Sequence, residues 1–128
     1  MSDEEKLDDS KIVKALLDNG AKVDEQDESG ETALMWASER GNLDIDAVLL
    51  DKNASIDKES PTRSTALMFA SRFGRLGIVV LLVERGADIH HKNVAGDTEL
   101  MNASRIGKKS GLLSFYLEKV LIFKRKIP

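Results

Sequence analysis

The chain has 128 residues, enough for one domain with a buried core, and 41% of them are hydrophobic and 32% charged. It contains no cysteine, which excludes disulfides, thiolate nucleophiles and cysteine-ligated metal sites. No apolar run approaches the roughly 18 residues of a membrane-spanning helix, and the first residues are acidic, the wrong sign for a signal or transit peptide. We therefore expect an intracellular protein without a transmembrane segment, cytoplasmic or also nuclear.

The net charge of −3 hides an asymmetry along the chain. Residues 1–31 carry eleven acidic and four basic side chains, whereas residues 101–128 carry one acidic and seven basic side chains. The acidic first part argues against nucleic acid as the main partner. The basic end leaves open an interaction with an anionic surface.

A period of 33 residues organises the sequence. The segment 32–38, Thr-Ala-Leu-Met-Trp-Ala-Ser, recurs with one change as 65–71 and with two changes as 98–104. Gly41, Gly74 and Gly107 keep the same step. Self-similarity at this period indicates a solenoid, because one such unit cannot bury its apolar side chains alone.

Each unit is expected to contain two short helices and a loop. The threonines at 32, 65 and 98 are typical N-cap residues, and the glycine at 41 is typical of a helix end. A second helix is predicted from about residue 44 to 52, with its counterpart around 78–82. At the N-terminus only a second helix, 11–18, is clearly predicted.

These residues resemble the ankyrin repeat family. The family pattern is matched by Gly30, Thr32, Leu34, Ala37, Gly41, Leu49-Leu50 and Asn53-Ala54. It is matched again by Thr65, Leu67, Ala70, Gly74, Leu81-Leu82 and Gly86-Ala87-Asp88. The resemblance implies an all-α repeat fold, an ankyrin solenoid of stacked helix–turn–helix units with β-hairpin-type loops. The usual Pro is replaced by Ala33, Ala66 or Glu99, and the usual His is Met in all three units.

One loop departs from the others, because Arg63 stands where the neighbouring units have Gly30 and Gly96. If the position requires a positive φ, Arg63 is strained by about 1 kcal/mol; otherwise the loop bends differently. The preceding Ser60-Pro61 favours the second alternative.

The repeat predicts five segments: a partial or capping repeat at 1–26, repeats at 27–59 and 60–92, a degenerate repeat at 93–119, and an apolar, basic tail at 120–128. Glu4 falls in register with Ala37, so the first residues would not pack as the other first helices do. We expect the tail to pack as a cap; the alternative is an anchor to a membrane surface or an acidic partner. The tail also resembles the frameshifted remnant of a longer array.

No catalytic constellation is found. His90 and His91 are adjacent in a loop, where side chains point apart, so we expect surface residues rather than a metal site. No carboxylate is expected in apolar surroundings that would raise its pKa for acid–base chemistry. We expect no enzyme activity, no cofactor and no metal.

The resemblance implies partner binding on a concave face made of first helices and hairpin tips, by a monomeric, non-catalytic interaction module or adaptor. The first-helix candidates are Trp36, Glu39, Arg40, Phe69, Arg72, Phe73 and Arg105. The hairpin-tip candidates are Glu28, Glu31, Thr62, Arg63 and Asp97. The aromatic residues have an alternative role in packing between units, and the arginines could form plain solvated surface.

Two other interpretations stay open. The chain could bind an anionic surface, whether acidic protein, lipid or nucleic acid, through Arg105, Lys108, Lys109 and the basic tail. It could also be a degenerate array without a dedicated partner.

Overall fold

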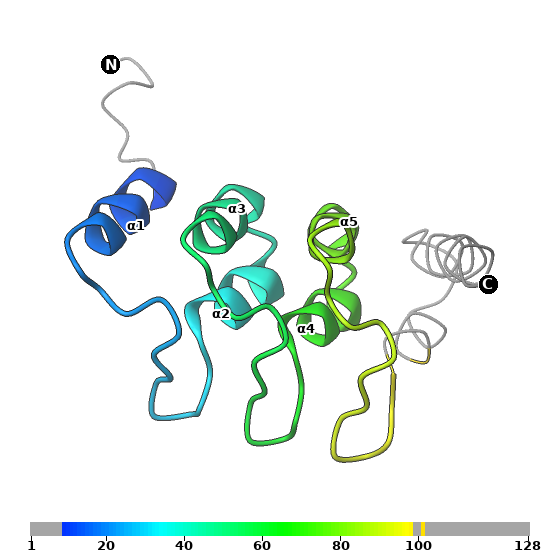
Figure 1. The fold of residues 1–128 in the computed structure, drawn as a ribbon. Helices are drawn as coiled ribbons and strands as arrows, with labels where there is room; N and C mark the ends of the chain where they lie inside the picture. Colours follow the sequence, from blue (N-terminus) through cyan, green and yellow to red (C-terminus); the bar gives the residue numbers. More distant parts are fainter. Residues whose placement is uncertain (1–8, 99–100, 102–128) are drawn as a thin grey trace, which may run out of the picture.

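The computed structural model describes residues 9–98 and residue 101, which form five α-helices and no strand in that part of the chain (Figure 1). The helices lie in two layers. Helices α1, α3 and α5 stack in one row, and α2 and α4 pack on each other in a second row beside it. Three long loops project from the stack on the same side. The helix bounds are Asp9–Asp18 for α1, Ala33–Arg40 for α2, Leu43–Asp51 for α3, Ala66–Arg72 for α4 and Leu76–Glu84 for α5.

The first helix of a unit starts at a threonine, as predicted. The Thr32 hydroxyl accepts a 3.3 Å hydrogen bond from the Met35 N–H, and Thr65 accepts one of 3.4 Å from Met68. Gly41 ends α2 with a φ of 82°, and its N–H donates to the Ala37 carbonyl at 2.9 Å. Local cap chemistry therefore sets the bounds of these helices.

The core is continuous from unit to unit. Large buried apolar side chains come from both helix rows, among them Met35 on α2, Leu67 on α4 and Leu82 on α5. Ala37 and Ala70 are buried as well, and their short side chains allow the close approach of α2 and α4. Because each unit is covered by its neighbours, the stack is one cooperative core.

All three loops contain the same closed turn. The bonds that close it run from Asp27 N to Glu31 O, from Ser60 N to Ser64 O and from Asn93 N to Asp97 O, at 2.9, 2.9 and 3.0 Å. In each turn the fourth residue has a positive φ, 77° at Gly30, 60° at Arg63 and 83° at Gly96. The expectation that the loop around Arg63 bends differently was wrong. Pro61 fits the second position of this turn, where φ is negative, so it does not force another path.

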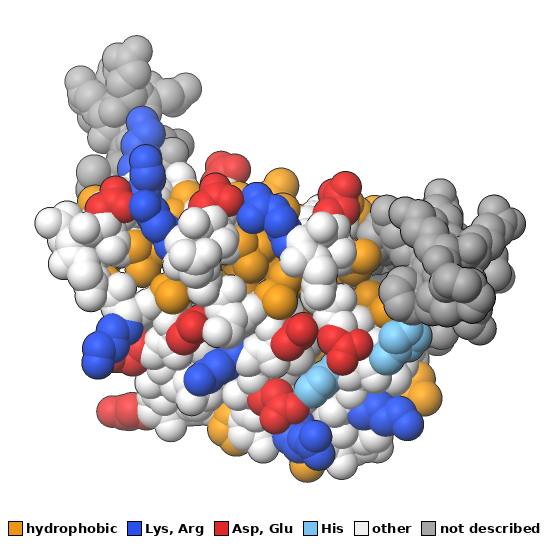
Figure 2. Space-filling model, viewed as in Figure 1, with side chains coloured by type: hydrophobic (Ala, Val, Ile, Leu, Met, Phe, Trp, Pro, Cys, Tyr) orange, Lys and Arg blue, Asp and Glu red, His pale blue; other side chains and the backbone are white. Residues whose placement is uncertain are grey.

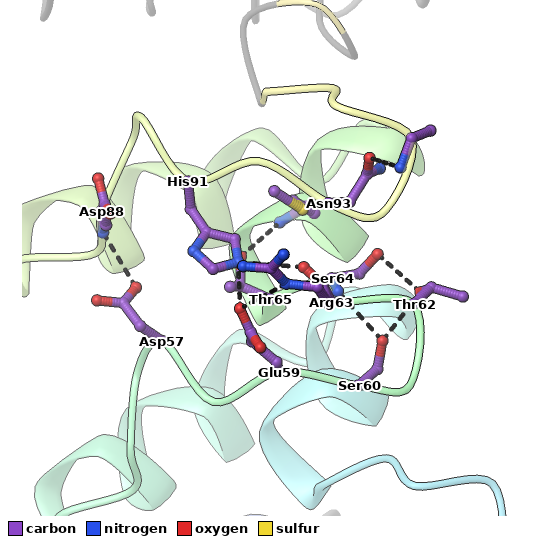
Figure 3. A network of polar contacts seen from close by, with 12 residues as sticks. Asp57, Glu59, Ser60, Thr62, Arg63, Ser64, Thr65, Asp88, His91 and Asn93 are labelled. Carbon is purple, nitrogen blue, oxygen red and sulfur yellow. Dashed lines mark hydrogen bonds and ion pairs between the residues drawn. The ribbon is translucent and has the colours of Figure 1, made fainter.

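Hydrogen bonds also join successive loops. The Asp24 carboxylate accepts from the Ser55 N–H at 2.8 Å and from its hydroxyl at 2.7 Å. One unit later, the Asp57 carboxylate accepts from the Asp88 N–H at 3.0 Å (Figure 3). These acidic side chains therefore connect each loop to the next.

The predicted unit boundaries stay predictions. Most of the degenerate repeat at 93–119 and the whole tail at 120–128 lie outside the described residues. None of α1–α5, the longest of which has 10 residues, reaches the length that a bilayer span requires.

Candidate functional site

Trp36 is an exposed aromatic side chain of α2 that is fixed on two sides. Its indole N–H donates a 2.8 Å hydrogen bond to Asp27 Oδ2 in the loop of the same unit. The Arg40 guanidinium, one turn further along α2, lies 4.8 Å from the centre of the Trp36 ring. Since 37% of Trp36 is exposed, the pair presents an oriented aromatic ring beside a cation.

The loop beside Trp36 is acidic. Hydrogen bonds from the Glu31 N–H, from the Trp36 indole and from Ser29 hold the pKa of Asp27 below its usual value. Burial raises the pKa of Glu31, and repulsion from Glu39 and Asp27 acts in the same direction. Asp27 is therefore charged at neutral pH and lies next to the Trp36–Arg40 pair.

In the next unit the aromatic positions have separate environments. Phe69, in register with Trp36, is only 6% exposed, with the Arg72 guanidinium 5.6 Å from its ring centre. Phe69 therefore packs between units and is not available to a partner, because α2 lies against α4. Phe73, which follows the end of α4, is 46% exposed, and Arg72 is exposed too.

The loop candidates are at the surface to different degrees. Glu28, Thr62 and Arg63 are exposed, whereas Glu31 and Asp97 are half-buried, as is Glu39 on α2. Arg105, Lys108 and Lys109 lie outside the described residues, as does the basic tail.

His91 has a role that sequence reasoning missed, since we expected a plain surface residue. Its Nε2 lies 2.9 Å from Glu59 Oε2 and 3.1 Å from the Arg63 carbonyl oxygen (Figure 3). Both neighbours are acceptors, so Nε2 carries the hydrogen. Glu59 also lies 3.6 Å from the Arg63 Nε. The half-buried imidazole thus connects two loops whose residues are about 30 positions apart in the sequence.

The tips of the same two loops are also joined. The Val94 N–H donates to the Thr62 carbonyl at 2.9 Å. The Thr62 hydroxyl lies 3.0 Å from both the Ser60 and the Ser64 hydroxyls. These contacts restrain the loop tips that carry candidate residues.

Asp46 corrects another expectation, that no carboxylate lies in apolar surroundings. It has no exposed surface; Oδ2 accepts from the Ser38 hydroxyl at 3.0 Å, and Oδ1 has no hydrogen-bond partner. Burial raises the pKa of Asp46 to about 7, against a smaller lowering by the Ser38 bond. The signal was present in the sequence, because Val13 and Val79 occupy the same position of the repeat.

The visible surface has mixed charge. Figure 2 shows acidic and basic side chains interspersed over the loops and helix ends, with hydrophobic side chains gathered in a band along the stack. Within residues 9–98 and 101, no group of three or more His, Asp or Glu side chains could hold a metal ion.

The chain was also compared with models of known protein families. A family model described as ankyrin repeats, in three copies, matches residues 5–93. The match confirms the resemblance and the all-α repeat fold class that the 33-residue period predicts. The comparison with curated proteins gave no match.

Proposed function

Since the chain belongs to the ankyrin repeat family, whose repeats are generally protein–protein interaction modules and typically non-catalytic, we propose that it binds a partner protein. The proposed contact surface, called here the first-helix face, consists of Trp36, Arg40, Arg72 and Phe73 with the neighbouring loop tips. The partner is held without a chemical step. The cysteine-free sequence suits a reducing compartment, so the interaction is proposed to occur inside the cell, with the protein acting as a monomer.

The observation that carries this proposal is the Trp36–Arg40 pair. Tryptophan and arginine are the residue types enriched at the energetic centres of protein interfaces. Asp27 and Arg40 already fix the indole orientation, so little side-chain entropy is lost when a partner covers the ring. A partner gains both apolar contact and a charged neighbour at one place.

The next unit extends the surface with the opposite charge. Arg72 and Phe73 are exposed there, whereas Asp27, Glu31 and Glu39 lie around Trp36. The surface is therefore acidic at the first loop and basic at α4. This polarity supports a partner segment that carries basic residues toward Asp27 and acidic residues toward Arg72.

The scaffold beneath the surface is restrained. Bonds from Ser55 to Asp24, from Asp88 to Asp57 and from His91 to Glu59 tie each loop to its neighbour. Binding residues that stand on such a scaffold need not be ordered at the moment of association.

The test compares two variants of the full chain by capture from a lysate of the source cells and mass spectrometry. One variant carries Arg40→Glu, Arg72→Glu and Phe73→Ala. The control carries Lys14→Glu and Lys22→Glu, two exposed charge reversals outside this face. Circular dichroism and thermal unfolding establish that both fold.

We expect the wild type and the control to retain a common protein that the first variant loses. Equal capture by all three chains would contradict the first-helix face. Capture that is abolished by added salt and by deletion of residues 120–128 would instead favour an anionic partner bound by the basic tail.

A further inference from the structure

Apolar side chains at the N-terminal end of the stack are exposed, although the same repeat positions are buried one unit later. Leu16 on α1 is 58% exposed, whereas Leu49 is 1% exposed. Trp36 on α2 is 37% exposed, whereas Phe69 is 6% exposed. Ala33 is exposed too, although its counterpart Ala66 is buried.

The difference comes from what covers each set. The buried counterparts are covered by α2, which packs on α4 and on α3. Within residues 9–98, no helix lies in the corresponding place, beside α2 and next to α1 (Figure 1). A groove of about 350 Å³ is found there instead, lined by Ala33, Trp36, Ala37, Arg40, Asn42 and Ile45.

We propose that this N-terminal face, made of Leu16, Ala33, Trp36 and Ile45, is a docking site for one α-helix of a partner protein. The helix lies on the face as α2 lies on α4. This inference rests on the proposed function and deepens it, because it names a helix as the partner element and places it at the end of the stack.

The chain itself shows which chemistry such a helix needs. The buried side chains of α2 are Leu34, Met35, Ala37 and Ser38, all uncharged and mostly short or flexible. A docked helix of about two turns therefore presents uncharged, compact side chains at a spacing of three or four residues. A charged residue on that side would be buried without a partner.

Asn42 and Arg40 indicate the direction of the helix. One unit later, Arg75 Nε donates a 2.9 Å hydrogen bond to the Glu39 carbonyl at the end of α2. Asn42 occupies the same repeat position as Arg75 and lines the groove, so its amide can donate to a terminal carbonyl of the docked helix. The Arg40 charge favours a helix C-terminus at this end.

The chain's own first residues do not match this chemistry. In register with α2, Glu4 and Glu5 correspond to Ala37 and Ser38, which are buried. Packing that segment as α2 packs would bury two carboxylates, which is unfavourable. A helix supplied by a partner protein, with uncharged residues at these positions, avoids that cost.

The test uses a peptide with the sequence of residues 65–75, acetylated and amidated, as a stand-in for the partner helix. Trp36 is the chain's single tryptophan, and the peptide contains none, so fluorescence reports on this face. We expect a saturable shift of Trp36 emission to shorter wavelength. Leu16→Glu should weaken binding roughly tenfold or more, whereas the control Val94→Glu, at a distant loop tip, should not.

A covalent version keeps the test decisive if the short peptide is poorly helical. Residues 1–9 are replaced by a copy of residues 32–42, which puts the helix in register. We expect the graft to raise the midpoint of unfolding. A copy that carries glutamates at the positions of Ala37 and Ser38 should not raise it.

The inference is overturned if neither peptide nor graft has an effect, or if Leu16→Glu binds the peptide as well as the wild type does. A dimer in light scattering that Leu16→Glu dissociates would also overturn it, in favour of self-association. If the face fails these tests while Arg72→Glu and Phe73→Ala abolish partner capture, the proposed function stands without the inference.

Discussion

The Ser38 hydroxyl donates a 3.0 Å hydrogen bond to Oδ2 of Asp46 inside the core between α2 and α3, and Oδ1 of the same carboxyl has no hydrogen-bond partner. One unit later the corresponding residues are Ser71 and Val79, both buried. The two units thus share a fold but differ by one ionisable group in the core. This difference makes the stability of the stack depend on pH.

The first prediction concerns the direction of that dependence. Burial raises the pKa of Asp46 to about 7, from about 3.9 in an unfolded chain. Between these values the folded protein holds a proton that the unfolded chain has lost. The free energy of unfolding therefore falls as pH rises, by about 1.4 kcal/mol per pH unit, and levels off above about pH 7. Urea unfolding at pH 5, 6, 7 and 8 measures this slope.

The control for this measurement is Asp46→Asn, which keeps the shape of the side chain and removes its titration. Subtracting its profile removes contributions from other groups, such as Asp18 and Asp27, whose lowered pKa values act at more acidic pH. The assignment to Asp46 fails if the Asn variant keeps the slope of the wild type.

A second prediction replaces Asp46 with valine, the residue found at the equivalent positions 13 and 79 of the neighbouring units. Asp46→Val should raise the free energy of unfolding at pH 8 by about 1–3 kcal/mol, because it removes a buried acceptor without a partner. The gain should be smaller at pH 5, where Asp46 is neutral. The unit that contains Ser71 and Val79 shows that the fold accommodates a buried serine with valine at this position. A loss of stability at pH 8 would show that the buried Asp46 carboxyl does not destabilise the fold.

The features that could be predicted from sequence are those set by local chemistry. Thr32 and Thr65 cap α2 and α4 because an N-cap bond spans only three residues. The 33-residue step predicts the stacking, because each unit needs neighbours to bury its apolar side chains.

Other features depend on the neighbouring unit and could not be predicted. Trp36 and Phe69 share a repeat position, yet Phe69 is covered by α2 and is 6% exposed, whereas Trp36 is 37% exposed. The His91–Glu59 contact depends on the distance between two loops, which no local pattern encodes. Asp46 is the exception, because aligning it with Val13 and Val79 would have shown an acid at an apolar position.

A third prediction concerns Arg63, which has a φ of 60° where the other loops have glycine. Arg63→Gly should stabilise the protein by about 0.5–1 kcal/mol, since glycine adopts this conformation without a steric penalty. The lost Arg63–Glu59 contact, 3.6 Å long and largely exposed, offsets little of this gain. The midpoint of urea unfolding is the measurement.

Gly96→Ala is the matched control for Arg63→Gly. Its φ is 83°, and an added Cβ would meet no atom within 4 Å, so the change isolates the backbone effect. We expect it to lower stability by about 1 kcal/mol. If Arg63→Gly lowers the midpoint as well, strain at Arg63 is not the dominant effect there.

The last prediction separates Phe69, in the middle of α4, from Phe73, which follows its end. Phe69 is buried, so Phe69→Ala should cost about 3–5 kcal/mol, a large fraction of the total stability of a stack of this size. The milder Phe69→Leu should cost about 1 kcal/mol and leave partner binding intact. Phe73, which is 46% exposed, should show the opposite pattern, with Phe73→Ala costing under about 1 kcal/mol and weakening capture of the partner. Thermal unfolding and capture, measured on the same preparations, check both; binding lost in Phe69→Leu but kept in Phe73→Ala would reverse the two roles.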